Sequence, residues 1–179
     1  MEAVVYLAIA SILLVIIANI FITQSQVYDK ETAKSDIDLY AKTALNRIVE
    51  ASLSATTVVA SRNFGVTNFQ SGHQTLILEL PSLDNNQNIL INTYDYLALY
   101  LDPDTSSKLY MQIDAATGTA RLDKTILLAT FVTNLNFRYN KSNTVEATKI
   151  DVSLALEKIV RGITQRSENT TAIFLKNKL

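Results

Sequence analysis

The chain has no cysteine, one histidine, two prolines and four glycines among its 179 residues. The lack of cysteine excludes a disulfide framework, a thiolate nucleophile and a cysteine-ligated metal. The single histidine, His73, has no second metal ligand or nucleophile nearby in the sequence, so we expect it in a loop. The glycines are widely scattered, which excludes a glycine-rich phosphate loop. We therefore expect a protein that is not an enzyme and needs no cofactor.

Charge is also sparse. Charged residues make up 18% of the chain, the net charge is -1 and the pI is about 5.8. This balance gives no electrostatic footprint for nucleic acid, so we expect no direct nucleic-acid binding. A chain of this length has room for one domain and an appendage.

Residues 3–22 form the longest apolar run, AVVYLAIASILLVIIANIFI, in which only Ser11 and Asn19 are strongly polar. A helix of about 20 apolar residues spans the ~30 Å hydrocarbon layer of a membrane. A signal peptide would need a basic segment before a shorter run and small residues after it, and the sequence has neither. We interpret the run as a transmembrane helix; the core helix of a soluble protein is the other alternative.

An amphipathic segment continues this helix without a breaker, because the first glycine is Gly65 and the first proline is Pro81. We predict one helix from Met1 to about Ala60, ~90 Å long, that is ended by Asn63 and Gly65. Apolar or small residues recur in the second half at helical spacing, at Ile37, Tyr40, Ala41, Ala44, Leu45, Ile48, Ser52 and Ala55.

Residues 63–179 are expected to form the globular part, after a membrane segment at 1–23 and the amphipathic helix at 24–62. Short apolar runs bounded by turn residues predict strands at 75–80, 88–93, 96–101, 108–114 and 119–122. The last two should form a hairpin across residues 115–118. We predict an α+β fold in which an antiparallel sheet of four to seven strands packs on the amphipathic half of the helix.

Two further segments complete this prediction. Residues 145–156 contain an alternating stretch whose members Ile150, Val152, Leu154 and Leu156 should face the core. The segment 161–169 is polar, so we expect it to be exposed.

Several polar groups have both a functional and a structural interpretation. Asp102 and Asp104 could bind Ca²⁺, but they lack the regular ligand spacing of a calcium loop and flank a proline, which favours a turn. Asn140 and Asn169 open glycosylation sequons, which we also interpret as turns. The tyrosines at 94–100 are expected to pack on the sheet.

The first ten residues, MEAVVYLAIA, resemble the N-terminal signature of the type IV pilin and type II secretion pseudopilin superfamily. In that family a leader is cleaved after a glycine, the new N-terminus is methylated, and an acidic residue opens a long aliphatic segment. The resemblance implies that Glu2 is the assembly residue, which pairs with the N-terminal amine of a neighbouring subunit. Only Met1 precedes Glu2 here, which leaves two alternatives: the leader and about three mature residues are missing from this sequence, which we favour, or Met1 is a true start and the chain is not processed in this way.

The C-terminal half carries weaker motifs in the order expected for the family. Residues 130–139, TFVTNLNFRY, resemble a strand of the larger minor pseudopilins, and residues 169–177, NTTAIFLKN, resemble their closing strand. The helix lacks the proline kink common in major pilins. Together these features suggest a minor subunit.

The resemblance implies a structural subunit of a type IV pilus, a type II secretion system or a DNA-uptake filament. It would lie in the bacterial inner membrane with its globular domain outside the cytoplasm. Its partners would be other pilin or pseudopilin subunits, a leader peptidase and an assembly platform. The alternative is a bitopic membrane protein with an extracytoplasmic sensor or ligand-binding domain. A membrane-tethered enzyme is a third class, for which no residues can be nominated.

Overall fold

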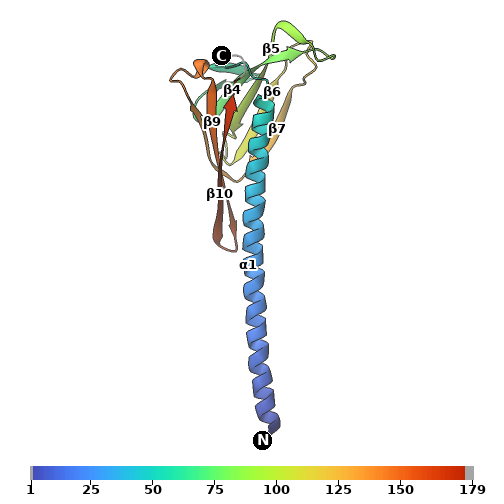
Figure 1. The fold of residues 1–179 in the computed structure, drawn as a ribbon, viewed down its shortest axis with the longest axis vertical. Coiled ribbons are helices and arrows are strands. Elements are labelled where there is room, and N and C mark those ends of the chain that lie inside the picture. Colours follow the sequence, from blue (N-terminus) through green and yellow to red (C-terminus); the bar gives the residue numbers. More distant parts are fainter. Residues whose placement is uncertain (1, 176–179) are drawn as a thin grey trace.

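Helix α1 (Glu2–Ser52) is the longest element of the computed structural model, which describes residues 2–175. It carries an antiparallel β domain at its C-terminal end, while its N-terminal half projects away from that domain (Figure 1). The chain therefore has the predicted α+β fold, with a long helix packed against antiparallel β-structure.

The helix ends at Ser52, eight residues before the predicted boundary near Ala60. The next four residues after a short turn, Thr56–Val59, are all β-branched and therefore favour extended backbone. The amide of Thr56 donates to the carbonyl of Glu79 at 2.9 Å, so the chain enters a sheet directly. The helix therefore stops before Ala55, although Ala55 continues the helical spacing in the sequence, because pairing with a distant strand outweighs that local pattern.

The prediction that Asn63 and Gly65 end the helix is wrong. Both residues belong to a separate hairpin. Strands β2 (Ser61–Phe64) and β3 (Thr67–Gln70) pair with each other only, and Gly65 lies in their turn with a φ of 61°. A positive φ suits glycine, because it has no Cβ to clash with the backbone.

The larger sheet has five antiparallel strands in the order β1-β4-β5-β6-β7. Its strands are β1 (Thr57–Val58), β4 (Thr75–Leu83), β5 (Ile89–Leu101), β6 (Lys108–Asp114) and β7 (Lys124–Thr130). The two strands predicted at 88–93 and 96–101 are one continuous strand, β5. Asn92 lies inside it with a φ of 57°, a local irregularity where the sequence pattern suggested an end.

A second sheet has three antiparallel strands in the order β10-β9-β8. Its strands are β8 (Val132–Tyr139), β9 (Lys149–Val160) and β10 (Ile163–Phe174), with a short 3₁₀ helix, η1 (Thr144–Glu146), before β9. The described residues thus contain ten strands, more than the four to seven predicted. The excess comes from the separate hairpin, the short strand β1 and segments whose polarity concealed a strand.

Two predicted strand boundaries are wrong for identifiable reasons. Strand β6 pairs with β7, which begins at Lys124, and residues 119–122 are an irregular connection that binds Asp95. The strand predicted at 130–139 is broken at Phe131, whose φ is 60°. This bend passes the chain from the five-stranded sheet to the three-stranded one.

The polar segment 161–169 is largely exposed, as expected, and most of it lies within β10. Strand β10 pairs along its whole length with β9, from Ile163 with Val160 to Phe174 with Lys149. Its side chains are polar because one face of the strand is solvated, a pattern that antiparallel sheets tolerate. The resembling closing segment 169–177 falls partly in this strand, and its last two residues lie outside the described residues.

The main core lies between the second half of α1 and the two larger sheets. Ala41, Ala44 and Ile48 on the helix are fully buried, as the helical spacing predicted. The alternation in β9 is also confirmed, because its four predicted inward residues are at most 1% exposed: Ile150, Val152, Leu154 and Leu156. The β2–β3 hairpin covers a smaller cluster formed by Phe64, Ile77 and Ala98.

The β9–β10 hairpin extends beyond the rest of its sheet. Strand β8 pairs with β9 only as far as Leu156, so the last part of the hairpin has no β8 neighbour. This part runs beside α1 toward the N-terminal half of the helix (Figure 1).

Candidate functional site: the exposed half of helix α1

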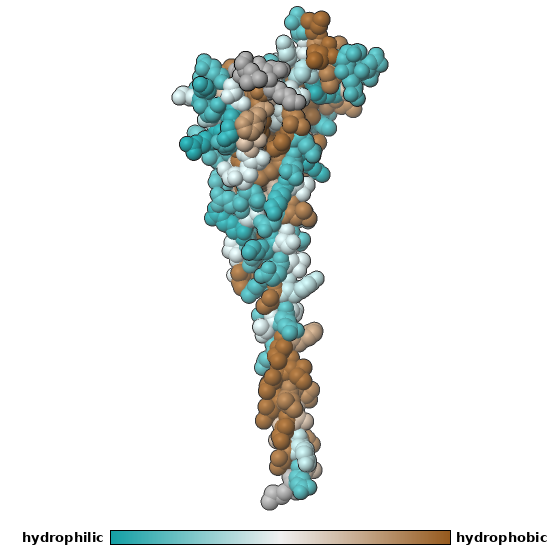
Figure 2. Space-filling model, in the orientation of Figure 1, coloured by the Kyte–Doolittle hydropathy of each residue, from teal (hydrophilic) through white to brown (hydrophobic). Residues whose placement is uncertain are grey.

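The N-terminal part of α1, residues 2–32, is exposed except at the partly buried Ser25, Asp29 and Lys30, and we call it the shaft. The first buried residue of the helix is Ala33. Apolar side chains surround the middle of the shaft, which forms a continuous hydrophobic surface outside the β domain (Figure 2). Leu7 is 70% exposed and Phe21 73%. Among the described residues, α1 is the one helix that is long and apolar enough to cross a membrane.

Two hydroxyl groups within the shaft satisfy their hydrogen-bonding capacity inside the helix. Ser11 Oγ donates to the Leu7 carbonyl at 2.8 Å, and Thr23 Oγ1 donates to the Asn19 carbonyl at the same distance. Such bonds to the carbonyl four residues earlier reduce the cost of placing a hydroxyl in hydrocarbon. The shaft is therefore compatible with a single-pass membrane protein in its backbone, its length and its polar side chains.

Glu2 lies in the first turn of α1, exposed and at the end of the shaft farthest from the β domain (Figure 1). A carboxylate at this position interacts favourably with the helix dipole, which is one structural reason for an acidic residue there. The structure does not bring Glu2 near the other candidate residues, which all lie in the β domain.

His73 lies in the bend before β4, as predicted, and is exposed. Its carbonyl accepts a hydrogen bond from the Phe137 amide at 2.8 Å, which ties the bend to β8. Residues 2–175 contain no group of three or more His, Cys, Asp or Glu side chains that could hold a metal ion.

Asp102 is a turn residue whose carboxylate is occupied locally. Its Oδ1 accepts from the Asp104 amide at 3.1 Å and its Oδ2 from Thr105 Oγ1 at 2.9 Å. Side-chain to backbone bonds over two residues are typical of aspartate in turns. The turn interpretation of this segment is therefore confirmed.

The two sequon asparagines differ. Asn140 is a turn residue, as predicted: its Oδ1 accepts from the Thr148 amide at 3.0 Å and its Nδ2 donates to Thr148 Oγ1 at 2.8 Å. Asn169 is not in a turn but within β10, paired with Leu154. That prediction was wrong because the polar sequence around it forms a solvated strand.

The tyrosines of β5 pack on the sheet, as expected. The guanidinium carbon of Arg62 lies 3.3 Å from the centre of the Tyr96 ring, and the rings of Phe69 and Tyr100 are 4.4 Å apart. Burial raises the pKa of the Tyr96 and Tyr100 hydroxyls above the ordinary range. These rings hold the β2–β3 hairpin on the larger sheet.

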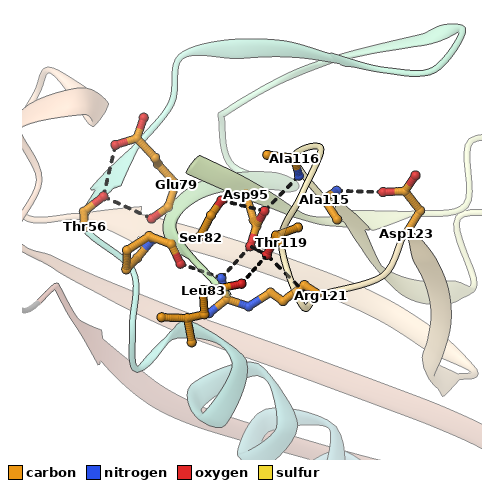
Figure 3. Close-up of polar contacts among 11 residues, drawn as sticks. Thr56, Glu79, Ser82, Leu83, Asp95, Ala115, Ala116, Thr119, Arg121 and Asp123 are labelled. Carbon is orange, nitrogen blue, oxygen red and sulfur yellow. Dashed lines mark hydrogen bonds and ion pairs between the residues drawn. The ribbon is translucent and has the colours of Figure 1, made fainter. Parts of the chain in front are cut away.

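A buried carboxylate, Asp95, is the polar centre of the domain and was not predicted from the sequence. Its side chain is fully buried and accepts from Ser82 Oγ at 2.8 Å, from the Ala116 amide at 2.8 Å and from Thr119 Oγ1 at 3.1 Å. Arg121 Nη1 completes the cluster at 2.7 Å and also donates to the Pro81 carbonyl at 2.6 Å (Figure 3).

Opposing effects act on the charge of Asp95. Burial pushes the pKa of its carboxyl upward, but the hydrogen bonds from Ala116, Arg121, Ser82 and Thr119 outweigh burial and hold this pKa below its ordinary value. The carboxylate is thus ionised and fully satisfied, and it anchors residues 115–123 on β5. An acidic residue inside the apolar run of β5 was the one sequence signal that could have pointed to it.

The fold therefore joins a β domain with a satisfied polar interior to an apolar shaft that the domain leaves uncovered. The shaft is therefore the candidate interaction surface of the protein. Comparison of the chain with known protein families, with curated proteins and with solved structures gives no match.

Proposed function

We propose that the protein is a minor subunit of a pilin-like filament, of the type IV pilus, type II secretion or DNA-uptake class. Its shaft holds it in the bacterial inner membrane and later packs among the helices of neighbouring subunits. The observation that supports this most directly is the continuity of α1, which passes from the exposed shaft into the core of the β domain without a linker.

The exposed apolar surface of the shaft requires a cover in each state of the protein. In the membrane, lipid covers side chains such as Leu7 and Leu14, which are 70% and 67% exposed. Outside the membrane the same side chains would face water at a cost of roughly 25 cal/mol per Å². Packing of several shafts in a filament core removes that cost.

Polar groups of the shaft can direct this packing. Helices in lipid gain little from apolar contact alone, so hydrogen bonds and close packing between helices decide how they associate. The Asn19 side chain lies near the outer end of the span and can form such bonds. Glu2 would pair with the N-terminal amine of a neighbour, as the family resemblance implies, because an unpaired charge entering the hydrocarbon costs several kcal/mol.

The linkerless connection suits an assembly subunit better than a flexible receptor. Because Ile37, Ala41 and Ile48 are buried against the sheets, the position of the shaft sets the position of the domain. A leader peptidase that exposes the N-terminus and an assembly platform that extracts the shaft are the partners that this function requires.

The exposure of the shaft allows a direct test by site-specific photocross-linking in the native host. A photoreactive amino acid replaces Leu13, which is 53% exposed in the shaft; the control replaces Leu122, which is 76% exposed in the β domain. We expect adducts at the first site with N-terminal helices of other filament subunits, in the sheared filament fraction. Adducts confined to lipid would favour the bitopic sensor instead.

The N-terminus of the native protein gives an independent test. We expect mass spectrometry to find a cleaved, methylated end just upstream of Glu2, and Glu2→Gln to reduce incorporation into filaments while the protein stays in the membrane. An unprocessed N-terminus preceded by a folded domain would exclude the proposal. Detection of the protein at every position along a purified filament would exclude the minor role.

A further inference from the structure

The free end of the β9–β10 hairpin, residues 157–166, is the feature of the domain nearest to the apolar shaft, and we call it the hairpin tip. Its two-residue turn consists of Arg161 and Gly162, whose φ values are 49° and 76°. Two consecutive positive φ angles define the tight turn that matches the twist of antiparallel strands. The hairpin tip is therefore a compact, well-formed projection.

An ion pair sets the height of the hairpin tip along α1. Arg161 Nη2 lies 2.5 Å from Asp29 Oδ2. Asp29 follows Ile22, the last residue of the apolar run, by seven residues, which corresponds to about 10 Å at 1.5 Å per residue. The headgroup layer on each side of a bilayer is roughly 5–7 Å thick. When the apolar run spans the hydrocarbon and α1 is perpendicular to the membrane, the hairpin tip therefore lies about 3–5 Å outside the headgroup layer, a gap that a tilt of α1 toward the hairpin closes.

Four large hydrophobic side chains are exposed at this level, among charged residues. On the hairpin tip, Ile159 is 71% exposed and Ile163 41%. On the adjacent stretch of α1, Val27 is 52% exposed and Tyr28 72%. Tyrosine and aliphatic side chains beside lysine or arginine are typical of segments at the membrane–water interface.

The charges at this level are nearly balanced. The hairpin tip and the adjacent part of α1 carry four basic and four acidic residues, which are Lys30, Lys158, Arg161 and Arg166, and Asp29, Glu31, Glu157 and Glu168. Arg161 is paired with Asp29, and Arg166 Nη2 lies 3.2 Å from Glu168 Oε2. A partner of strongly negative or positive charge is therefore not favoured, whereas a zwitterionic headgroup layer accepts both the ion pairs and the isoleucines.

We propose that the hairpin tip rests on the outer headgroup layer of the membrane while α1 spans it. The inference rests on membrane insertion of the shaft, which is part of the proposed function. Ile159 and Ile163 enter the interface, so the protein touches the bilayer at two places, and the second contact limits how far the domain can tilt over the membrane. Extraction of the subunit into a filament must break this contact.

The chain contains no tryptophan, so one introduced tryptophan is a unique fluorescent reporter. Three full-length variants are reconstituted separately in phosphatidylcholine vesicles that are plain, carry a nitroxide on the headgroups, or carry bromine on the acyl chains. Ile159→Trp reports on the hairpin tip and Leu13→Trp on the span. Ile91→Trp is the matched control, an isoleucine that is 86% exposed on β5, whose turn with β4 lies at the end of the domain farthest from the shaft (Figure 1).

We expect the headgroup nitroxide to quench Ile159→Trp, the brominated acyl chains to quench Leu13→Trp, and neither to quench Ile91→Trp. Ile163→Trp, on the opposite strand, should be quenched by the nitroxide as well, which guards against a local effect of one substitution. Quenching of Leu13→Trp alone would overturn the inference while leaving membrane insertion intact. Failure to quench Leu13→Trp would contradict insertion itself.

A neighbouring subunit is the other possible cover of the hairpin tip, and the same reporters distinguish it. In that case the emission of Ile159→Trp would shift to shorter wavelength as the protein density in the vesicles rises, and the headgroup nitroxide would not quench it. This outcome would also overturn the membrane contact.

Discussion

Arg121 Nη1 lies 2.7 Å from Asp95 Oδ2 inside the β domain, whereas Arg62 Nη2 lies 3.0 Å from Asp114 Oδ2 at its surface. The two pairs have the same residue types but different surroundings. The Asp95 side chain is fully buried, and that of Asp114 is 30% exposed. This contrast makes the second pair a built-in control for the first.

Replacing Asp95 by asparagine should destabilise the domain strongly. The substitution removes the negative charge that pairs with Arg121. It also places an amide NH₂ group where the wild-type carboxylate accepts hydrogen bonds. We therefore expect a loss of about 3 kcal/mol in the free energy of unfolding. Asp114→Asn should cost less than about 1 kcal/mol, because exposed ion pairs contribute little. Urea unfolding of the full chain in mild detergent measures both, and equal losses would contradict the role given to burial.

The same pair predicts a dependence on pH. The folded-state pKa of Asp95 is lowered, so the stabilisation by its ionised form is fully present above the unfolded pKa of about 3.9 and is lost as the pH falls through the folded pKa. The stability difference between the wild type and Asp95→Asn should therefore be constant at neutral pH and shrink below about pH 4. A difference that shrinks between pH 8 and 6 would point to another group.

Truncating Ile48 on the buried face of α1 should weaken the contact between the helix and the sheets. Ile48 is fully buried, so Ile48→Ala should cost about 2–5 kcal/mol of unfolding free energy. Leu39 lies on the opposite, exposed side of the same helix, at 62% exposure, and Leu39→Ala should stay within about 0.5 kcal/mol. Thermal unfolding followed by circular dichroism tests the pair, and equal effects would contradict the assigned face.

Tyr139 should titrate at unusually high pH. Burial raises the pKa of its hydroxyl to about 12, and this hydroxyl donates to the Gly72 carbonyl at 3.0 Å. Because the folded pKa is raised, its stabilisation is complete below the unfolded pKa of about 10 and is lost as the pH rises toward 12.

The measurement is the tyrosinate absorbance of the wild type and of Tyr139→Phe between neutral pH and the onset of alkaline unfolding. The variant should lack the last tyrosine to ionise and should lose about 1 kcal/mol of stability at neutral pH. If the titration step missing from the variant had an ordinary tyrosine pKa, the result would contradict the burial of the Tyr139 hydroxyl.

A charge in the middle of the shaft should impair membrane insertion. Ile12→Lys places an ammonium group near the centre of the span, which costs about 2.5–3.5 kcal/mol on insertion scales. Leu39→Lys adds the same charge to an exposed site of α1 beside the β domain and should have no effect. Extraction of membranes with alkaline carbonate should release a larger fraction of the first variant only; equal retention would contradict a single span at residues 3–22.

The sequence predicted the features that depend on periodicity. The helical recurrence of Ala41, Ala44 and Ile48 and the alternation from Ile150 to Leu156 each identify one buried face, and such faces depend on neighbours near in sequence. The apolar run at 3–22 predicted the shaft for the same reason.

Features that depend on distant partners escaped prediction. The helix ends at Ser52 because Thr56 pairs with Glu79 in another part of the chain, and residues 119–122 are irregular because Arg121 reaches Asp95. The first half of β10 was not predicted as a strand, since its polar side chains conceal its pairing with β9. In each case a long-range contact outweighed a local preference.

The part of α1 before Ala33 acts as a lever. Its 31 residues reach about 46 Å, so a rotation of 5° at the domain moves the far end by about 4 Å. Small changes in the packing around Ile37 therefore produce larger displacements at the N-terminal end of the shaft. The ion pair between Arg161 and Asp29 limits this displacement, because it attaches the helix to the β domain four residues farther toward the N-terminus than Ala33.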